Sequence, residues 1–125
     1  MGLEAMTEEP LSPEQVLNQH LELSRSGDED EFMWSYRDDS FLIMAGGVHR
    51  GLERIRACYR QLKDQLPNAR YTYQILIVEE DVALLEWSAD SDTHTVADGA
   101  DSYVIRKNYI HAQTIHYTLI PKKNS

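Results

Sequence analysis

Residues 71–90 read YTYQILIVEEDVALLEWSAD, and this stretch decides the fold class. Residues 71–78 are dense in aromatic and β-branched side chains, which favour strands. The acidic triplet at 79–81 predicts a turn, and Val82 begins a second apolar run that reaches about Asp90. Strands joined by so short a turn pair antiparallel, so the stretch predicts two neighbouring strands of an antiparallel sheet.

The sequence beyond this stretch predicts two more strands. Residues 92–99 are polar and predict a loop. Residues 100–107 and 110–120 predict a hairpin, with its turn at residues 107–108. The tail at 121–125 is polar, and we expect it to fray.

The residues before this stretch predict three helices. Ser12 can cap the first, Pro13 suits its first turn, and Gln15 completes a capping box. Side chains at helical spacing then share one face of this helix: Val16, Leu17, His20, Leu21 and Ser24. Asp28 and Glu31 repeat the capping pattern and open a short second helix.

A strand over residues 41–45, ended by two glycines, precedes the third helix. This helix begins near Leu52 and ends before Pro67. Its apolar residues alternate three and four positions apart and form one stripe: Leu52, Ile55, Tyr59, Leu62 and Leu66.

This order of elements predicts a single α+β domain over residues 12–120, preceded by a disordered lead-in at residues 1–11. The helices gather on one face of the sheet. The concave side of such a sheet must be filled, either by side chains or by a ligand.

Composition and charge exclude several partners. The chain has 125 residues and a net charge of −9, which disfavours nucleic acid because phosphate binding needs Lys and Arg. The basic residues within 54–63 are mixed with acidic ones, and we interpret them as a solvated helix face. No apolar run is long enough to span a bilayer, so we expect no membrane partner.

The one cysteine, Cys58, is interpreted as a packing residue, and its isolation fits a cytoplasmic protein.

Asp101 is the first candidate functional residue. It shares a strand face with Tyr103 and Ile105, so a buried carboxyl is expected there. Burial raises the pKa of a carboxyl, which can then act as a neutral hydrogen-bond donor or a general acid. The alternative is that Asp101 only caps a loop or a strand end.

His20 and Glu86 are the other two candidates. His20 lies on the apolar face of the first helix, where a histidine is either functional or a satisfied core residue. Glu86 lies in mid-strand between Leu85 and Trp87, where it faces either a pocket or solvent and a subunit interface.

We expect neither a metal nor a cofactor. His94, Asp98 and Asp101 lack the spacing of a zinc or calcium site. The sequence also has no phosphate-binding glycine loop, no dinucleotide fingerprint and no nucleophile elbow.

Five strings occur in order along the chain: VLNQHLELSRSGD at 16–28, YRDD at 36–39, GLERI at 51–55, EWSA at 86–89 and DGADSYVI at 98–105. Taken together, these strings resemble the nuclear transport factor 2-like superfamily. This superfamily includes ketosteroid isomerases, SnoaL-like polyketide cyclases and scytalone dehydratases. Their order and spacing are specific for the fold and not for one activity.

The resemblance implies a cystatin-like, cone-shaped barrel, in which three N-terminal helices pack on a curved antiparallel sheet around a pocket. The oxyanion-hole aspartate of ketosteroid isomerase, a carboxylic acid kept neutral by an apolar site, falls on Asp101. Its oxyanion-hole tyrosine falls on His20, and its general-base aspartate falls on Met44, which cannot take a proton. Glu86 is the predicted substitute base. The pocket wall is predicted to contain Met33, Tyr36, Leu42, Met44, Leu84, Ser88, Tyr103, Gln113 and Tyr117.

Three functions stay open. The first is an isomerase, cyclase or dehydratase that acts on an apolar substrate, with Asp101 and His20 as donors and Glu86 as base. The second is a module that binds a small apolar molecule without changing it, which the loss of the base at Met44 favours. The third is a dimerising domain with a collapsed core.

We also expect a homodimer. The predicted outer face of the sheet carries Trp87, Val104 and Thr114, and this surface is too apolar to be left in water. The resemblance likewise implies dimers packed through their sheets.

Overall fold

The computed structural model describes residues 11–26 and 28–123. The helices are α2 (Pro13–Ser26), α3 (Glu29–Met33) and α4 (Leu52–Gln65). The strands are β1 (Phe41–Met44), β2 (Gly47–Arg50), β3 (Arg70–Glu79), β4 (Val82–Asp90), β5 (His94–Arg106), β6 (Tyr109–His116) and β7 (Ile120–Pro121).

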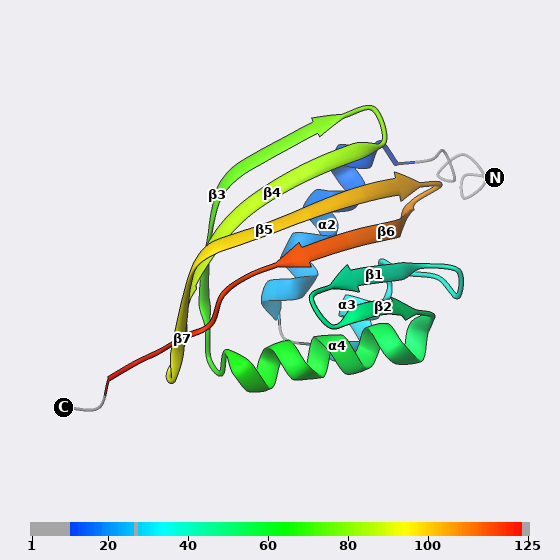
Figure 1. Cartoon of the computed structure of the whole chain (residues 1–125). Helices are drawn as coiled ribbons and strands as arrows, with labels where there is room; N and C mark the ends of the chain where they lie inside the picture. The colour runs from blue at the N-terminus through cyan, green and yellow to red at the C-terminus, as the bar shows by residue number, and fades with distance from the viewer. Residues whose placement is uncertain (1–10, 27, 124–125) are drawn as a thin grey trace.

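The strands form one curved sheet in the order β2-β1-β6-β5-β4-β3, and β7 pairs with the beginning of β5. The pairings are antiparallel except that between β1 and β6, which is parallel. In Figure 1 the long strands bend across the molecule, α2 lies behind them and α4 runs along the edge near β1 and β2. The α+β class predicted from the sequence is therefore confirmed, with the helices on the concave side of the sheet.

The predicted start of α2 is confirmed in detail. The Ser12 amide donates to Oε1 of Gln15 over 2.8 Å, and the Gln15 amide donates to Oγ of Ser12 over 3.1 Å. The face predicted for this helix is the buried one, and His20 is only 2% exposed. A second cap opens α3, where the Glu31 amide donates to Oδ1 of Asp28. These caps satisfy amides that have no partner within the helix, and so set where each helix begins.

Several backbone predictions were wrong. Residues 94–99 extend β5 instead of forming a loop, because their backbone pairs with the end of β4 and with β7. The short strand β2 was missed, since four residues carry too little periodicity to be recognised. Pro121 pairs with His94, and Lys122 forms an ion pair with Asp90, so this part of the tail is held on the sheet instead of frayed. The lead-in predicted at residues 1–11 lies outside the described residues except for Leu11.

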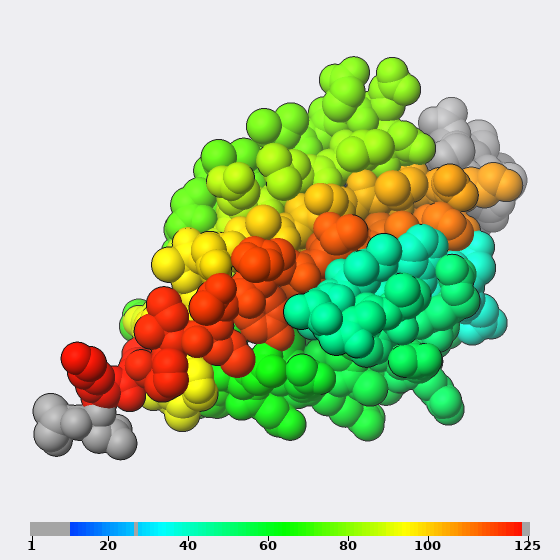
Figure 2. Space-filling view, in the orientation of Figure 1, coloured from blue at the N-terminus to red at the C-terminus, as the bar shows by residue number. Residues whose placement is uncertain are grey.

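The core lies between the helices and the concave face of the sheet. Within the described part of the chain, no helix is long and apolar enough to cross a membrane. Figure 2, in the orientation of Figure 1, shows the convex face of the sheet, where none of the described helices covers β4, β5 or β6.

Candidate functional site

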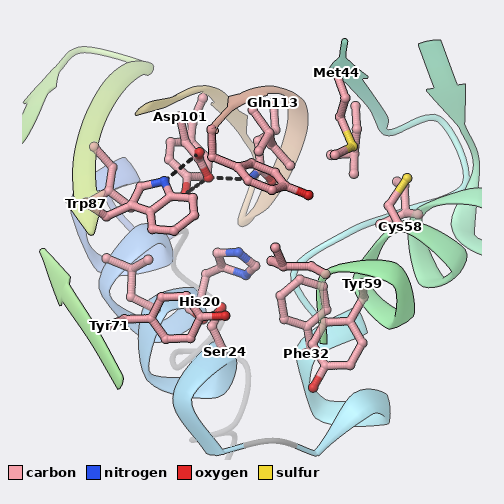
Figure 3. Close-up of a pocket in the computed structure, with 18 of the residues that line it drawn as sticks. His20, Ser24, Phe32, Met44, Cys58, Tyr59, Tyr71, Trp87, Asp101 and Gln113 are labelled. Carbon is pink, nitrogen blue, oxygen red and sulfur yellow. Dashed lines mark hydrogen bonds between the residues drawn. The ribbon is translucent and has the colours of Figure 1, made fainter. Parts of the chain in front are cut away.

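A cavity of about 90 Å³ lies between the concave face of the sheet and the three helices. Its wall is mainly apolar and aromatic, with polar side chains at a few positions, which is the composition usual for small-molecule sites. The wall is formed by His20, Leu21, Ser24, Phe32, Tyr36, Leu42, Met44, Ile55, Cys58, Tyr59, Leu62, Lys63, Tyr71, Tyr73, Leu85, Trp87, Asp101, Tyr103, Gln113, Ile115 and Tyr117. Figure 3 draws 18 of these side chains, which converge from both the helices and the strands.

Asp101 is a buried carboxyl group at the sheet side of this cavity. It lies on β5, is 8% exposed and accepts hydrogen bonds from three side chains. Nε1 of Trp87 donates to Oδ1 over 2.9 Å, while Nε2 of Gln113 and the Tyr103 hydroxyl donate to Oδ2 over 3.1 and 3.3 Å. The donors come from β4, β5 and β6, so three adjacent strands position one carboxyl (Figure 3).

Two opposing effects set the pKa of Asp101. Burial raises the pKa because it penalises the carboxylate, whereas the hydrogen bonds from Trp87, Gln113 and Tyr103 lower it because they stabilise the charge. The net result is a rise to about 6. Asp101 therefore changes charge close to neutral pH, as an acid–base catalyst requires.

The hydrogen-bond chain continues from Gln113 toward α2. The Tyr36 hydroxyl donates to Oε1 of Gln113 over 2.6 Å and lies 3.5 Å from Nε2 of His20. Nδ1 of His20 lies 2.9 Å from Oγ of Ser35. Burial lowers the pKa of His20 to about 3, so the imidazole is neutral at physiological pH. His20 is thus a neutral partner in the chain and not a source of charge.

The indole of Trp87 reaches Asp101 because the residue beside it is a glycine. Trp87 pairs with Gly99 across β4 and β5. A Cβ at position 99 would overlap the indole ring. Gly99 therefore gives the tryptophan the space to lie flat over the neighbouring strand, with its N–H toward the carboxyl.

The structure places eight of the predicted residues on the cavity wall. They are His20, Tyr36, Leu42, Met44, Asp101, Tyr103, Gln113 and Tyr117. Met33 is buried in the core but does not reach the cavity, because its neighbour Phe32 occupies the side of α3 that faces it. Met44 lines the cavity with a thioether at the place where the resemblance expects a base.

The assignment of the faces of β4 was wrong. Asp101 pairs directly with Leu85, and directly opposed residues project to the same side of a sheet. Glu86 therefore lies on the convex face and is exposed, together with Leu84 and the half-buried Ser88. Trp87, predicted to lie outside, is 4% exposed and lines the cavity. Glu86 cannot act as the base of this cavity.

Several wall residues were not predicted to line a pocket. Ile55, Cys58, Tyr59 and Leu62 come from the inward side of α4, and the apolar stripe of that helix already contained three of them. Lys63, interpreted from sequence as part of a solvated helix face, is half-buried at the cavity. Its position four residues after Tyr59 places it beside the apolar stripe of the helix, and this spacing separates it from its exposed neighbours. Within the described residues, no group of three His, Cys, Asp or Glu side chains is arranged to hold a metal ion.

Comparison with known families agrees with this geometry. The model of the SnoaL-like domain family matches residues 17–111. That match covers more than half of the chain, and the protein therefore belongs to the SnoaL-like domain family. No curated protein matches the sequence.

Solved structures with the same fold are similar in shape but distant in sequence. An NTF2-like protein from Cytophaga hutchinsonii is 11% identical with a TM-score of 0.72, over 88% of this chain and 93% of its own. A putative polyketide cyclase from Sinorhizobium meliloti is 17% identical with a TM-score of 0.69, over 82% and 94%. A protein with a cystatin-like fold from Methylobium petroleophilum is 17% identical with a TM-score of 0.67, over 93% and 90%. At such identities these likenesses establish the fold alone.

Proposed function

We propose that the protein binds a small, largely apolar molecule in this cavity and that Asp101 acts on it as the acid–base group. Isomerases, cyclases and dehydratases all need such a group in an apolar site. The structure described as a putative polyketide cyclase from Sinorhizobium meliloti shares the fold and supports this class of chemistry. The cytoplasmic location suggested by the single cysteine belongs to the same proposal.

The observation that carries the proposal is an acceptor position of Asp101 that none of the described residues fills. A carboxylate can accept about four hydrogen bonds. Three are taken by Trp87, Gln113 and Tyr103, and the carboxyl lines the cavity. The remaining position suits a hydroxyl or an acidic C–H of a ligand. Ionised, Asp101 accepts that proton, and protonated, it donates one to a developing oxyanion.

The first test measures binding of phenol and toluene, two rings of similar size that differ in a hydroxyl donor. We expect phenol to bind more tightly to the wild type by calorimetry, and Asp101→Asn to reduce this preference about tenfold because a charged acceptor is replaced by a neutral one. Glu86→Gln makes the same acid-to-amide change on the convex face and should leave the preference intact. Equal binding of the two rings by the wild type would refute the role of Asp101 as a hydrogen-bond anchor.

The second test asks whether Asp101 can remove a proton. The probe is 5-nitrobenzisoxazole, whose C3 proton passes to one base while its N–O bond breaks, with the electron pair ending on the phenolate oxygen. We expect the absorbance of this phenolate to grow faster with the wild type and with Glu86→Gln than with Asp101→Asn. The rate should rise once with pH, around the Asp101 pKa of about 6, and then level off.

A non-catalytic binding module is the second candidate, and two observations favour it. Met44 stands where the resemblance expects a base, and Glu86 lies on the opposite face of the sheet. If phenol binds as predicted but the three proteins open 5-nitrobenzisoxazole at the same rate, the protein is a binding module. Binding and catalysis are therefore separated by the two probes.

We also propose that the protein forms a homodimer through the convex face of the sheet. Trp87 does not contribute to this face, but several exposed apolar side chains do: Ile75, Ile77, Val82 and Leu84. Together they make a patch on β3 and β4 of the kind that protein interfaces cover.

A further inference from the structure

The mouth of the cavity carries positive charge that the proposed function does not use. An open polar hollow adjoins the cavity and shares Ser24, Lys63 and Tyr71 with it. The rest of the wall of the hollow is formed by Arg25, Ala69, Arg70 and Thr72. Three cationic residues, Arg25, Lys63 and Arg70, and no acidic residue therefore line this hollow among the described residues. In a chain with a net charge of −9, this concentration of positive charge runs against the overall composition.

Lys63 connects the two spaces. It lies in the last turn of α4, is half-buried, and holds its ammonium 5.3 Å from the centre of the Tyr59 ring. Burial lowers the pKa of Lys63, and no carboxylate in residues 11–26 or 28–123 forms an ion pair with it. The Tyr59 hydroxyl beside it is buried and also has no hydrogen-bond partner among the described residues. Partly desolvated groups without partners are costly, and an anion from outside would lower that cost.

The two arginines add to the same charge. The Arg25 guanidinium lies 4.5 Å over the ring of Tyr73. Arg70 stands opposite Asp90 in the sheet, but Asp90 is already paired with Lys122 at 2.7 Å. Because Asp90 is neutralised by Lys122, it does not cancel the positive charge of the mouth.

The other end of the cavity has the opposite character. Asp101 lies there, and in Figure 3 Ser24 and Tyr71 lie on the far side of His20 from it. An anion placed beside an ionised Asp101 would be repelled. The apolar wall between the two ends therefore orients a ligand, with a neutral donor toward Asp101 and any negative charge toward Lys63.

We propose that the ligand is an apolar carboxylic acid, bound with its carboxylate at Lys63 in the mouth and its apolar body in the cavity. This inference rests on the proposed function, because it assumes that the cavity holds a small molecule. It adds a class of ligand and an orientation. The positive mouth would also attract such anions from solution and select them over neutral molecules of the same shape.

The test uses three compounds that separate the two ends of the site. They are 3-(4-hydroxyphenyl)propionate, its amide, and 3-phenylpropionate. The first differs from its amide at one end, where a charged carboxylate replaces a neutral amide of similar size, and this difference reports on Lys63. It differs from 3-phenylpropionate only in the hydroxyl, which reports on Asp101. Dissociation constants are measured by calorimetry at low salt and at a pH above 7.

We expect the wild type to bind the acid about tenfold more tightly than the amide, since an ion-paired hydrogen bond replaces a neutral one. Lys63→Gln should abolish this preference, and Lys63→Arg should keep it. Lys107→Gln removes the same charge from the distant β5–β6 turn and should have no effect on it. Added salt should weaken binding of the acid and spare the amide.

Equal binding of the acid and the amide by the wild type would overturn the inference, as would a preference that survives Lys63→Gln. If the amide still binds, and 3-(4-hydroxyphenyl)propionate still binds more tightly than 3-phenylpropionate, the proposed function stands and only the carboxylate site is rejected. If none of the three compounds binds, the proposed function fails together with the inference.

Discussion

The pKa of Asp101 predicts how the stability of the protein changes with pH. In the folded state this pKa is raised from 3.8 to about 6. Each pH unit of difference corresponds to about 1.4 kcal/mol, so ionising the folded protein costs about 3 kcal/mol more than ionising the unfolded chain. Because the folded pKa is the higher one, the protonated carboxyl contributes this free energy to the stability of the folded state. The contribution is fully present below about pH 4 and is lost as the pH rises through about 6.

Asp101→Asn removes the titrating group while keeping its size and an acceptor oxygen. We therefore expect the free energy of unfolding of the wild type, relative to this variant, to fall by about 3 kcal/mol between about pH 4 and about pH 8. The measurement is urea unfolding of both proteins, followed by tryptophan fluorescence at several pH values. Other titrating groups are common to both proteins and cancel in the difference.

Glu86→Gln supplies the control, because Glu86 is exposed on the convex face. The difference in free energy of unfolding between the wild type and Glu86→Gln should stay nearly constant between about pH 4 and about pH 8. A constant difference for Asp101→Asn as well would refute the reasoning, since it would mean that the carboxyl has the same pKa in the folded and unfolded states. A difference that grows in the opposite direction would mean that the three donors outweigh burial.

Three further predictions concern the fold around the site. Gly99→Ala forces a methyl group into the indole of Trp87 and should destabilise the protein by about 3 kcal/mol in urea unfolding, whereas Ala97→Gly on the same strand should cost less. Ser40→Ala should cost about 2 kcal/mol in the same assay, because the fully buried Ser40 hydroxyl donates to the Ile110 carbonyl over 2.6 Å; an unchanged midpoint would contradict this. Leu84→Lys should shift the protein to a 14.4 kDa monomer in sedimentation if the convex face is the dimer interface, and a wild type that is itself monomeric would reject the dimer.

Sequence patterns predict the helices well because their signals are local. The capping residues Ser12, Gln15 and Asp28 lie within three positions of the amides that they satisfy. The apolar faces of α2 and α4 follow from spacing alone. The parallel pairing of β1 with β6 has no such signal, because it joins segments about seventy residues apart, Phe41 with Ala112.

The face of β4 shows why part of the candidate site could not be predicted. Alternation separates Glu86 from Leu85 and Trp87 but does not say which set is buried. Only the pairing with β5 decides this, and a shift of one residue would exchange the two faces. Gly99 was the available signal, because a glycine opposite a tryptophan leaves room for the ring, but its use requires the register to be known first.

The register between β4 and β5 affects both the stability of the fold and the chemistry of the cavity. Trp87 fills the core and also donates to Asp101, and Gln113 links that carboxyl to Tyr36. A carboxyl at this depth without donors would stay protonated well above neutral pH, whereas one exposed to water would ionise well below it. Its pKa of about 6 exists only while three strands hold their donors in place. Mutations that loosen the register should therefore disturb the titration of Asp101 before they unfold the protein, since the donors act over distances of about 3 Å.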